Sequence, residues 1–298
     1  MTPNGVAPLS VVIPTIGRAK LLAECLGSVT ECRPRAAEVL VVDQSHDPEV
    51  ARVVDRFADL GARLVPCPGI GISRGRNVGL RAAAHEVVLV TDDDCTVAED
   101  WVAVAWAAME ADPEKIVTGP VFAGGDPMTV PSTRDLTHER DFTGRFRSDL
   151  LSPNNMALNR SLAVALGGFD ERFGPREVAE DGDFCYRWLK AGHRMHFEPA
   201  LRVWHHAWRT PEQLERVYVD YMRGVGFLYA KHLRSGDLRM LVYLTRTLAA
   251  GLRGLAAAVV KGRPGWTDPR RGTFRGLPVG LWRGFRVFWL GRSSPPNP

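Results

Sequence analysis

Short apolar runs and helical apolar stripes alternate along the first 119 residues. The runs are rich in β-branched residues and predict strands at Leu9–Pro14, Glu38–Asp43, Arg63–Val65, Val87–Thr91 and Ile116–Gly119. Apolar residues at helical spacing predict helices at Lys20–Val29, Pro48–Leu60, Ser73–Ala84 and Asp100–Asp112. This alternation is typical of an α/β fold with a Rossmann-like, mostly parallel sheet flanked by helices.

The pattern changes after residue 120. The segment Gly124–Arg147 is polar, broken by proline and without periodicity, so it predicts a long loop. Regular structure is expected again at Met156–Leu166 and Glu180–Ala191, followed by a strand near Arg202–His205. We therefore divide the chain into two halves of one domain, 1–119 and 120–210, and a helical C-terminal region, 211–298.

The C-terminal region predicts three helices and one connector. We expect the helices at Pro211–Lys231, Leu238–Lys261 and Gly280–Gly291, and a connector rich in glycine, proline and arginine at Gly262–Pro278. Arginines in the second helix recur every seven residues, and the last helix mixes arginine with tryptophan and phenylalanine. Such helices fit an anionic membrane surface, and packing against the rest of the protein is the alternative.

Composition narrows the class of protein. Hydrophobic residues make up 45% and charged residues 24% of the 298 positions, which is ordinary for a globular protein with a sizeable core. The net charge is +4, and the basic excess lies late in the chain. That bias favours an acidic surface or an anionic substrate, and we expect no nucleic-acid partner.

Cysteine usage and hydropathy bear on location. The five cysteines are scattered without a Cys-x-x-Cys pair, which argues against a disulfide framework or a structural zinc. Met1–Ser10 lacks the features of a secretory signal, and no uncharged segment reaches the roughly 18–20 apolar residues of a membrane span. We expect a cytoplasmic protein, attached peripherally to the inner face of the cell membrane if the C-terminal helices bind lipid.

Three consecutive acids, Asp92–Asp94, follow the strand predicted at Val87–Thr91. Ligands of open α/β sheets bind at the carboxyl ends of the strands. Closely spaced carboxylates there suit a hard divalent cation that carries a diphosphate, and a surface turn of acids is the alternative. Right-handed crossovers place Pro14–Arg18 and Asp43 at the same edge. The pattern predicts an enzyme that uses a nucleotide-activated donor.

Six motifs occur in the order seen in family 2 glycosyltransferases. They are Ser10-Val-Val-Ile-Pro14-Thr15, Val42-Asp43, Gly75-Arg76-Asn77-Val78-Gly79, Asp92–Asp94, Gly167-Gly168-Phe169-Asp170-Glu171 and Glu180-Asp181-Gly182-Asp183. The resemblance covers about Leu9 to His206. It implies a GT-A fold that transfers a sugar from a nucleotide diphosphate with inversion. Residues 1–119 then resemble the half that binds the nucleotide sugar, and residues 120–210 the acceptor-binding, catalytic half.

The resemblance also implies the donor contacts. Asp43 resembles the acid that hydrogen-bonds the base, since a carboxylate can accept from the N–H of uracil; an Asx turn is the alternative. The loop that borders the nucleoside is expected at Pro14, Thr15 and Arg18. Arg76 and Asn77 are expected nearby, where an arginine fork can hold a base or a phosphate, and Arg74 is an alternative to Arg76. The flanking glycines indicate only a close approach of the backbone.

Asp92 and Asp94 resemble the outer acids of the family's Asp-x-Asp motif, with Asp93 between them in the donor site. The resemblance implies that Asp92 faces the ribose and that Asp94 ligates Mn²⁺ or Mg²⁺, which neutralises the leaving nucleotide diphosphate. His205 resembles the histidine that completes the metal shell, and imidazole suits Mn²⁺ better than Mg²⁺. The adjacent His206 is an alternative ligand.

Asp181 is the expected general base, because inverting transfer needs a carboxylate that takes the proton of the acceptor hydroxyl. Capping of the following helix is the alternative. The turn at Gly167–Asp170 resembles the family's turn near the donor sugar and the acceptor, and paired glycines also suit a helix C-cap. Four tryptophans could stack on sugars or belong to the core: Trp101, Trp188, Trp204 and Trp208.

These residues together predict an inverting, metal-dependent glycosyltransferase. We expect a uridine or thymidine diphosphate sugar as donor and an unidentified acceptor hydroxyl on a glycan, a lipid-linked glycan or a small molecule. A sugar-phosphate nucleotidyltransferase is one alternative, although the loop Pro14–Arg18 lacks the glycine density of those enzymes. A non-catalytic membrane-surface protein is the other, and the retained Asp92–Asp94 and Glu180-Asp181 argue against it.

Overall fold

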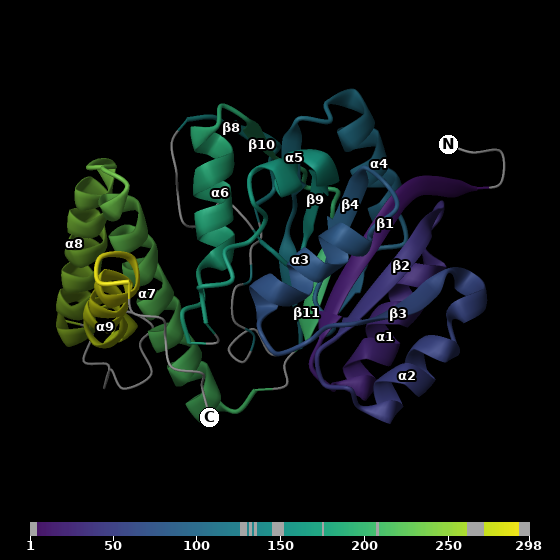
Figure 1. Cartoon of the computed structure of the whole chain (residues 1–298), viewed down its shortest axis with the longest axis horizontal. Helices are drawn as coiled ribbons and strands as arrows, with labels where there is room; N and C mark the ends of the chain where they lie inside the picture. The colour runs from purple at the N-terminus through teal and green to yellow at the C-terminus, as the bar shows by residue number, and fades with distance from the viewer. Residues whose placement is uncertain are drawn as a thin grey trace. The chain divides into compact units, whose positions relative to one another are not determined.

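The chain forms two compact units. One comprises Met1–Asp170 and Phe184–Trp208, and the other comprises Glu171–Asp183 and Arg209–Pro298; we call them the sheet unit and the helical unit (Figure 1). The computed structural model describes residues 5–125, 130, 133, 136–144, 152–174, 176–206, 209–260 and 271–291. The helical unit includes residues 171–183, which we expected in the second half of the sheet domain. The functional halves 1–119 and 120–210 stay predictions.

A mostly parallel sheet forms the centre of the sheet unit, which confirms the predicted fold class. Its strands are β1 (Val6–Thr15), β2 (Arg35–Asp43), β3 (Ala62–Pro66), β4 (Val87–Val90), β6 (Lys115–Thr118), β8 (Arg140–Phe142), β9 (Met156–Asn159) and β10 (Arg194–Phe197). Across the described residues the order is β3-β2-β1-β4-β9-β6-β10-β8. Strand β9 runs antiparallel to β4 and β6, and β8 runs antiparallel to β10, whereas the other pairs are parallel.

Helices cover both faces of this sheet (Figure 1). They are α1 (Ala19–Glu31), α2 (Pro48–Asp55), α3 (Ile72–Ala82), α4 (Trp101–Ala111), α5 (Arg160–Ala165) and α6 (Glu180–Lys190). Successive side chains of a strand point to opposite faces. Leu9, Val11 and Ile13 of β1 accordingly join one core with residues of α1, α2 and α4, whereas Val12 and Pro14 face α3.

Two glycines allow α3 to lie close to the sheet. A Cβ added at Gly79 would lie 2.2 Å from Cγ1 of Val12, and one at Gly75 would lie 3.1 Å from Cβ of Pro14. Side chains at these positions would push the helix away from β1. The close backbone approach predicted for these glycines is thus confirmed, and it brings Arg76 and Asn77 to the strand ends.

Several local predictions differ from the structure. The helix predicted at Pro48–Leu60 ends at Asp55, and Ala58–Leu60 form a 3₁₀ turn closed by Gly61 at φ +92°. The loop predicted at Gly124–Arg147 contains β8, which forms because it pairs with β10, a strand that we also did not predict. Residues 126–129, 131–132, 134–135 and 145–151 of that loop lie outside the described residues.

A second, smaller sheet lies next to the acidic triplet. It consists of β5 (Cys95–Val97), β11 (Val203–His206) and β7 (Val121–Gly124), in that order, with β11 antiparallel to β5 and parallel to β7. The strand near Arg202–His205 was predicted, whereas β5 and β7 were not. This sheet pairs the residues just after the acids with the two adjacent histidines.

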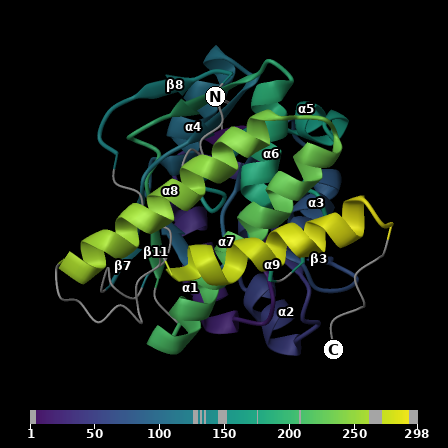
Figure 2. The ribbon, with the colours of Figure 1, turned by 90° about the vertical axis from the view of Figure 1, so that its left-hand side faces the viewer.

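The helical unit contains α7 (Pro211–Arg234), α8 (Arg239–Val260) and α9 (Arg271–Phe288). Figure 2 shows α8 and α9 on the viewer's side of α7. Four glycines of α9, spaced by four residues, face the backbone of α7: Gly272, Gly276, Gly280 and Gly284. A Cβ at Gly280 would lie 1.9 Å from the carbonyl oxygen of Arg223. Small residues at this spacing allow two helices to approach closely.

The predicted connector Gly262–Pro278 was wrong over Arg271–Pro278, which are helical. Glycine and proline suggested a break there, but the glycines serve the contact with α7, and the exposed Pro278 lies inside α9. Gly262–Arg270 lie outside the described residues. Among the helices that the structure describes, none combines the length and the apolar character needed to cross a membrane.

Candidate active site

The carboxyl ends of the central strands meet as predicted. Thr15, the last residue of β1, is paired with Asp43, the last residue of β2, and β4 lies on the other side of β1. The hydroxyl of Thr15 donates to Oδ2 of Asp93 at 2.5 Å. The loop after β1, the end of β2 and the acids after β4 therefore share one edge of the sheet.

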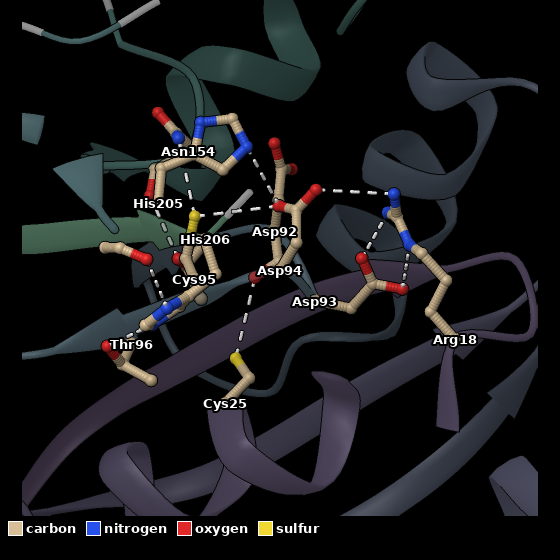
Figure 3. A network of polar contacts seen from close by, with 12 residues as sticks. Arg18, Cys25, Asp92, Asp93, Asp94, Cys95, Thr96, Asn154, His205 and His206 are labelled. Carbon is tan, nitrogen blue, oxygen red and sulfur yellow. Dashed lines mark hydrogen bonds and ion pairs between the residues drawn. The ribbon is translucent and has the colours of Figure 1, made fainter. Parts of the chain in front are cut away.

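Arg18 binds two of the three acids (Figure 3). Its Nη2 forms an ion pair with Oδ1 of Asp93, its Nε lies 3.1 Å from Oδ2 of the same residue, and its Nη1 lies 3.3 Å from Oδ2 of Asp94. Asp93 is 0% exposed. Burial raises the pKa of Asp93 to about 6, although Arg18 and Thr15 act in the opposite direction. Asp93 and Arg18 thus bind each other inside the protein, and their expected contacts with the donor stay predictions.

Strand pairing in the small sheet places one histidine beside Asp94. His205 is opposite Cys95 in the β5–β11 register, and the backbone N–H of His206 donates to the carbonyl oxygen of Asp94 at 2.8 Å. As a result, Nε2 of His205 lies 3.4 Å from Oδ1 of Asp94, and both side chains are buried (Figure 3).

His206 is held elsewhere. Its Nε2 lies 2.9 Å from the hydroxyl of Thr96, and its Nδ1 lies 3.2 Å from the carbonyl oxygen of Gly124. A side chain at position 124 would collide with this ring, since an added Cβ would lie 2.5 Å from Nδ1. Of the two adjacent histidines, His205 is therefore the one that faces Asp94.

The pair formed by Asp94 and His205 fits a small divalent cation. Two neighbouring ligands at about 2.1 Å from an octahedral ion lie roughly 3.0 Å apart, close to the separation of 3.4 Å between the two atoms. Within the described part of the chain, no group of three or more His, Cys, Asp or Glu side chains could hold a metal. Burial raises the pKa of the adjacent Cys95 thiol well above the usual value. Two protein ligands suit an ion that is also held by substrate phosphates.

Asp92 is the most accessible of the three acids and contacts Arg76. Its Oδ1 lies 3.3 Å from Nη2 of Arg76, which is buried and lies over the ring of Phe169 with its Cζ 5.4 Å from the ring centroid. Arg74 instead donates to the carbonyl oxygen of Pro68 at 3.0 Å. Arg76, rather than Arg74, therefore adjoins the acidic triplet.

Asn77 holds the turn that follows α5. Its Nδ2 donates to the carbonyl oxygen of Phe169, and its Oδ1 accepts from the N–H of Phe169, both at 2.8 Å. Gly167 and Gly168 adopt φ values of +84° and +65°, which favour glycine, and Arg187 donates to the carbonyl oxygen of Gly168 at 2.6 Å. The amide of Asn77 positions this turn, and its expected contact with the donor stays a prediction.

Asp43 forms the Asx turn that was the alternative for this residue. Its Oδ1 accepts from the N–H and the hydroxyl of Ser45 at 2.8 and 2.6 Å. Sequence reasoning missed the next residue, Gln44, whose Oε1 accepts from the N–H of Gly71 at 2.6 Å. A polar residue directly after a strand-end acid was the available signal. Oδ2 of Asp43 has no hydrogen bond with the described residues, so a role in base binding stays a prediction.

Asp181 lies in the first turn of α6, within the helical unit. It is the second residue of that helix, so it is not the N-cap residue. Asp183 is 0% exposed and accepts from Lys231 and from Nε2 of His232 at 2.7 and 2.8 Å. Lys231 and His232 were not predicted, because nothing in the sequence links the end of α7 to an acid almost fifty positions earlier. Within this segment Asp183 holds the helix, whereas Asp181 is half-buried.

Comparison with known families identifies the chain. The model of glycosyl transferase family 2 matches residues 10–165, which is more than half of the 298 residues. The chain belongs to this family. Membership makes the protein a glycosyltransferase and decides against both the nucleotidyltransferase and the non-catalytic alternative.

Relatives of this glycosyltransferase are distant. The glucosyl-dolichyl phosphate glucuronosyltransferase of Haloferax volcanii is 26% identical over 215 residues, which span 66% of this chain and 68% of the relative. Among solved structures, the mannosyltransferase PcManGT from Pyrobaculum calidifontis, in complex with GDP-Man and Mn²⁺, has a TM-score of 0.59 at 22% identity and covers 95% of this chain and 91% of its own. S. aureus TarS 1-349 with UDP-GlcNAc has a TM-score of 0.57 at 16% identity, with 96% and 93% covered. These likenesses show that this glycosyltransferase has the GT-A fold.

Two of the four candidate tryptophans of this glycosyltransferase, Trp101 and Trp188, belong to its core. Trp101 and Trp188 are fully buried, and their indole N–H groups donate to Asn155 and to the carbonyl oxygen of Arg194. Trp204 packs against Phe122, with ring centroids 5.7 Å apart, and Trp208 lies outside the described residues. Core packing therefore accounts for Trp101 and Trp188.

Proposed function

We propose that this glycosyltransferase binds a nucleotide diphosphate sugar at the edge formed by Asp43 and Asp92–Asp94, together with Mn²⁺ or Mg²⁺, and transfers the sugar with inversion to an acceptor hydroxyl. One observation carries the proposal: β5 and β11 bring Nε2 of His205 to within 3.4 Å of Oδ1 of Asp94, just after the end of a central strand. A ligand pair at that place in an α/β sheet suits a cation on a substrate diphosphate.

Asp94 and His205 would hold the metal. When bound, the metal neutralises negative charge on the diphosphate of the leaving nucleotide. Arg18 has a positioning role, because it fixes Oδ2 of Asp94 and leaves Oδ1 toward His205. The Pyrobaculum enzyme was solved with Mn²⁺, which supports a divalent ion here as well.

The base of the donor is assigned to Asp43 and the ribose to Asp92. A carboxylate at the end of β2 can accept from an imide N–H, which favours uridine or thymidine diphosphate sugars over other donors. Solved structures of similar fold contain GDP-Man and UDP-GlcNAc, so GDP, UDP and dTDP all belong in a test of the donor base. Pro14, Thr15 and Arg76 complete this donor region in the proposal.

Asp181 is the proposed general base. It would take the proton of the acceptor hydroxyl as the new glycosidic bond forms and the nucleotide diphosphate leaves. Its place beside Asp183, which Lys231 and His232 hold firmly, gives it a rigid helix end. The acceptor hydroxyl belongs to a glycan, a glycolipid or a natural product. The name of the Haloferax relative includes a glucosyl-dolichyl phosphate, which supports a lipid-linked sugar as the first acceptor to test.

A cytoplasmic location is part of the proposal. All five cysteines are buried thiols that form no disulfide within the described residues, which agrees with a reducing compartment.

Thermal unfolding in the presence of nucleotides tests the donor site. We expect UDP or dTDP with Mn²⁺ to raise the melting temperature of the wild type, since a ligand that binds the folded state stabilises it. The Asp94→Asn and His205→Ala variants should lose the Mn²⁺-dependent part of that shift. Asp59→Asn, an exposed acid of the 3₁₀ turn, is the matched control and should behave like the wild type. A full Mn²⁺-dependent shift in Asp94→Asn would refute the metal assignment.

A further inference from the structure

The helix α8 exposes an apolar stripe. Leu241, Leu248 and Leu252, at helical spacing, are all exposed, and Leu252 is 60% exposed. Residues on another side of the same helix, among them Met240 and Gly251, are buried. The leucine stripe therefore faces away from the core of the helical unit. Exposed there, these side chains do not contribute the free energy that burial of apolar surface would give.

The helix α9 exposes a row of aromatic rings. Trp282 is 61% and Trp289 is 52% exposed, and Phe285 stacks between them with ring centroids 5.9 Å from each. The glycines on the opposite side of α9 face α7. A contiguous exposed aromatic row of this kind marks an interaction surface. We call Leu241, Leu248, Leu252, Trp282, Phe285 and Trp289 the α8–α9 surface.

Positive charge accompanies this surface. From Leu238 to Pro298 the chain has eleven Lys or Arg residues and one acid, a formal charge of +10, whereas the whole chain carries +4. Arg246 and Arg253 are exposed on α8, and Arg286 is exposed on α9. The first 237 residues are thus net negative, and the charge asymmetry is confined to the segment that carries the apolar surface.

We propose that the α8–α9 surface docks onto an anionic lipid bilayer without crossing it. Apolar and aromatic side chains would enter the headgroup region while the arginines reach the lipid phosphates, as in interfacial amphipathic helices. A second copy of the chain fits less well, because two segments of charge +10 would repel each other. A docked surface goes beyond sugar transfer, because it would hold the enzyme where lipid-linked molecules are found.

Flotation of the full chain with vesicles tests the proposal independently of activity. The vesicles are phosphatidylcholine alone, or equal parts of phosphatidylcholine and phosphatidylglycerol, at low and at high salt. We expect flotation with the anionic vesicles at low salt and a loss of flotation at high salt, because salt screens charges. The double variant Arg246→Gln/Arg253→Gln should bind roughly 30-fold more weakly, given the contribution of each basic residue near an anionic surface.

A second double variant tests the apolar part. Trp282→Gln/Leu252→Gln should abolish flotation, while its unfolding temperature stays that of the wild type because both side chains are exposed. Val164→Gln, which changes a 45% exposed residue of α5 in the sheet unit, is the matched apolar control, and Arg52→Gln on α2 is the matched charge control. Both controls should float as the wild type does.

Three outcomes would overturn the proposal. The first is no flotation with either vesicle, and the second is unchanged flotation of Trp282→Gln/Leu252→Gln. The third is self-association of the wild type without vesicles that this double variant abolishes, since a second copy would then cover the α8–α9 surface.

Discussion

Each of the two acidic motifs contains one fully buried carboxylate. It is Asp93 in the sheet unit and Asp183 in the helical unit. Both are 0% exposed and both contact basic side chains: Arg18 binds Asp93, whereas Lys231 and His232 bind Asp183. They differ in what surrounds them. Arg18 also contacts Asp94 and is 23% exposed, whereas Lys231 and His232 are 13% and 6% exposed.

The comparison separates structure from chemistry within a run of acids. In each motif the fully buried acid is bound by basic side chains, and another acid of the motif, Asp94 or Asp181, is the residue that we propose for the reaction. In the sheet unit Arg18 contacts both the structural acid, Asp93, and the proposed metal ligand, Asp94. A substitution of Asp93 should therefore change both the stability of the protein and its affinity for the metal. In the helical unit we expect the two roles to be separable, because the side chains that bind Asp183 come from α7, whereas Asp181 lies on α6.

The largest expected effect is that of Asp181→Asn. Removing a general base lowers turnover by roughly 10²–10⁴-fold, and the isosteric amide keeps the shape of the helix end. Binding of nucleoside diphosphate with Mn²⁺ should remain that of the wild type, as measured by calorimetry beside single-turnover rates. Asp59→Asn is the control. Normal turnover of Asp181→Asn would remove Asp181 from the mechanism.

The next effect is on stability. Asp183→Ala leaves Lys231 and His232 buried without their carboxylate, which should cost about 3–5 kcal/mol of unfolding free energy. Asp93→Ala should cost less, because water reaches Arg18. Urea denaturation measures both. Asp183→Asn and Asp93→Asn replace the alanine variants if those do not fold.

The same variants sharpen the comparison through binding. Asp183→Ala should leave the affinity for Mn²⁺ and nucleoside diphosphate unchanged, whereas Asp93→Ala should weaken it because Arg18 then loses its anchor beside Asp94. Equal affinities in the two variants would show that the structural role of Asp93 is not coupled to metal binding at Asp94.

A smaller loss of unfolding free energy is expected for Arg18→Lys. An ammonium cannot reproduce the contacts of a guanidinium with both oxygens of Asp93 and with Asp94, and each lost hydrogen bond to a charged group is worth about 1.5–3 kcal/mol. Arg56→Lys on the surface is the matched control and should stay within about 0.5 kcal/mol of the wild type. An unchanged urea midpoint for Arg18→Lys would mean that a single positive charge suffices.

The sequence predicted the edge of the sheet better than the contacts at that edge. Strand ends at Pro14, Asp43 and Thr91 follow from apolar runs and from the geometry of parallel sheets, and the structure places the end of β1, the end of β2 and the acids after β4 together. The choice between His205 and His206 was not available from the sequence. It depends on the register of β5 against β11, and a shift by one residue would exchange the two histidines.

Other contacts could not be predicted from the sequence either, because they also depend on how distant segments of the chain come together. Asn77 binds the backbone of Phe169, and Asp183 binds Lys231 and His232, across separations at which no periodic pattern exists. The error in α9 had a different cause. Gly272 and Gly276 were assigned to a connector because of its glycine and proline content, although glycine at every fourth position lines one side of a helix that lies against another backbone.

The smallest expected effect is that of Arg52→Gln, and it tests whether burial is what distinguishes the two carboxylates. Arg52 and Glu49 form an ion pair on the surface of α2, with side chains 67% and 54% exposed. Water already solvates both groups, so the loss of unfolding free energy should be below about 1 kcal/mol. It should be smaller still in high salt, because salt screens the two charges. The free energy of unfolding in urea, at low and at high salt, measures it. If Arg52→Gln costs as much as Asp183→Ala, ion pairs stabilise this protein regardless of burial, and the contrast drawn between Asp93 and Asp183 loses its physical basis.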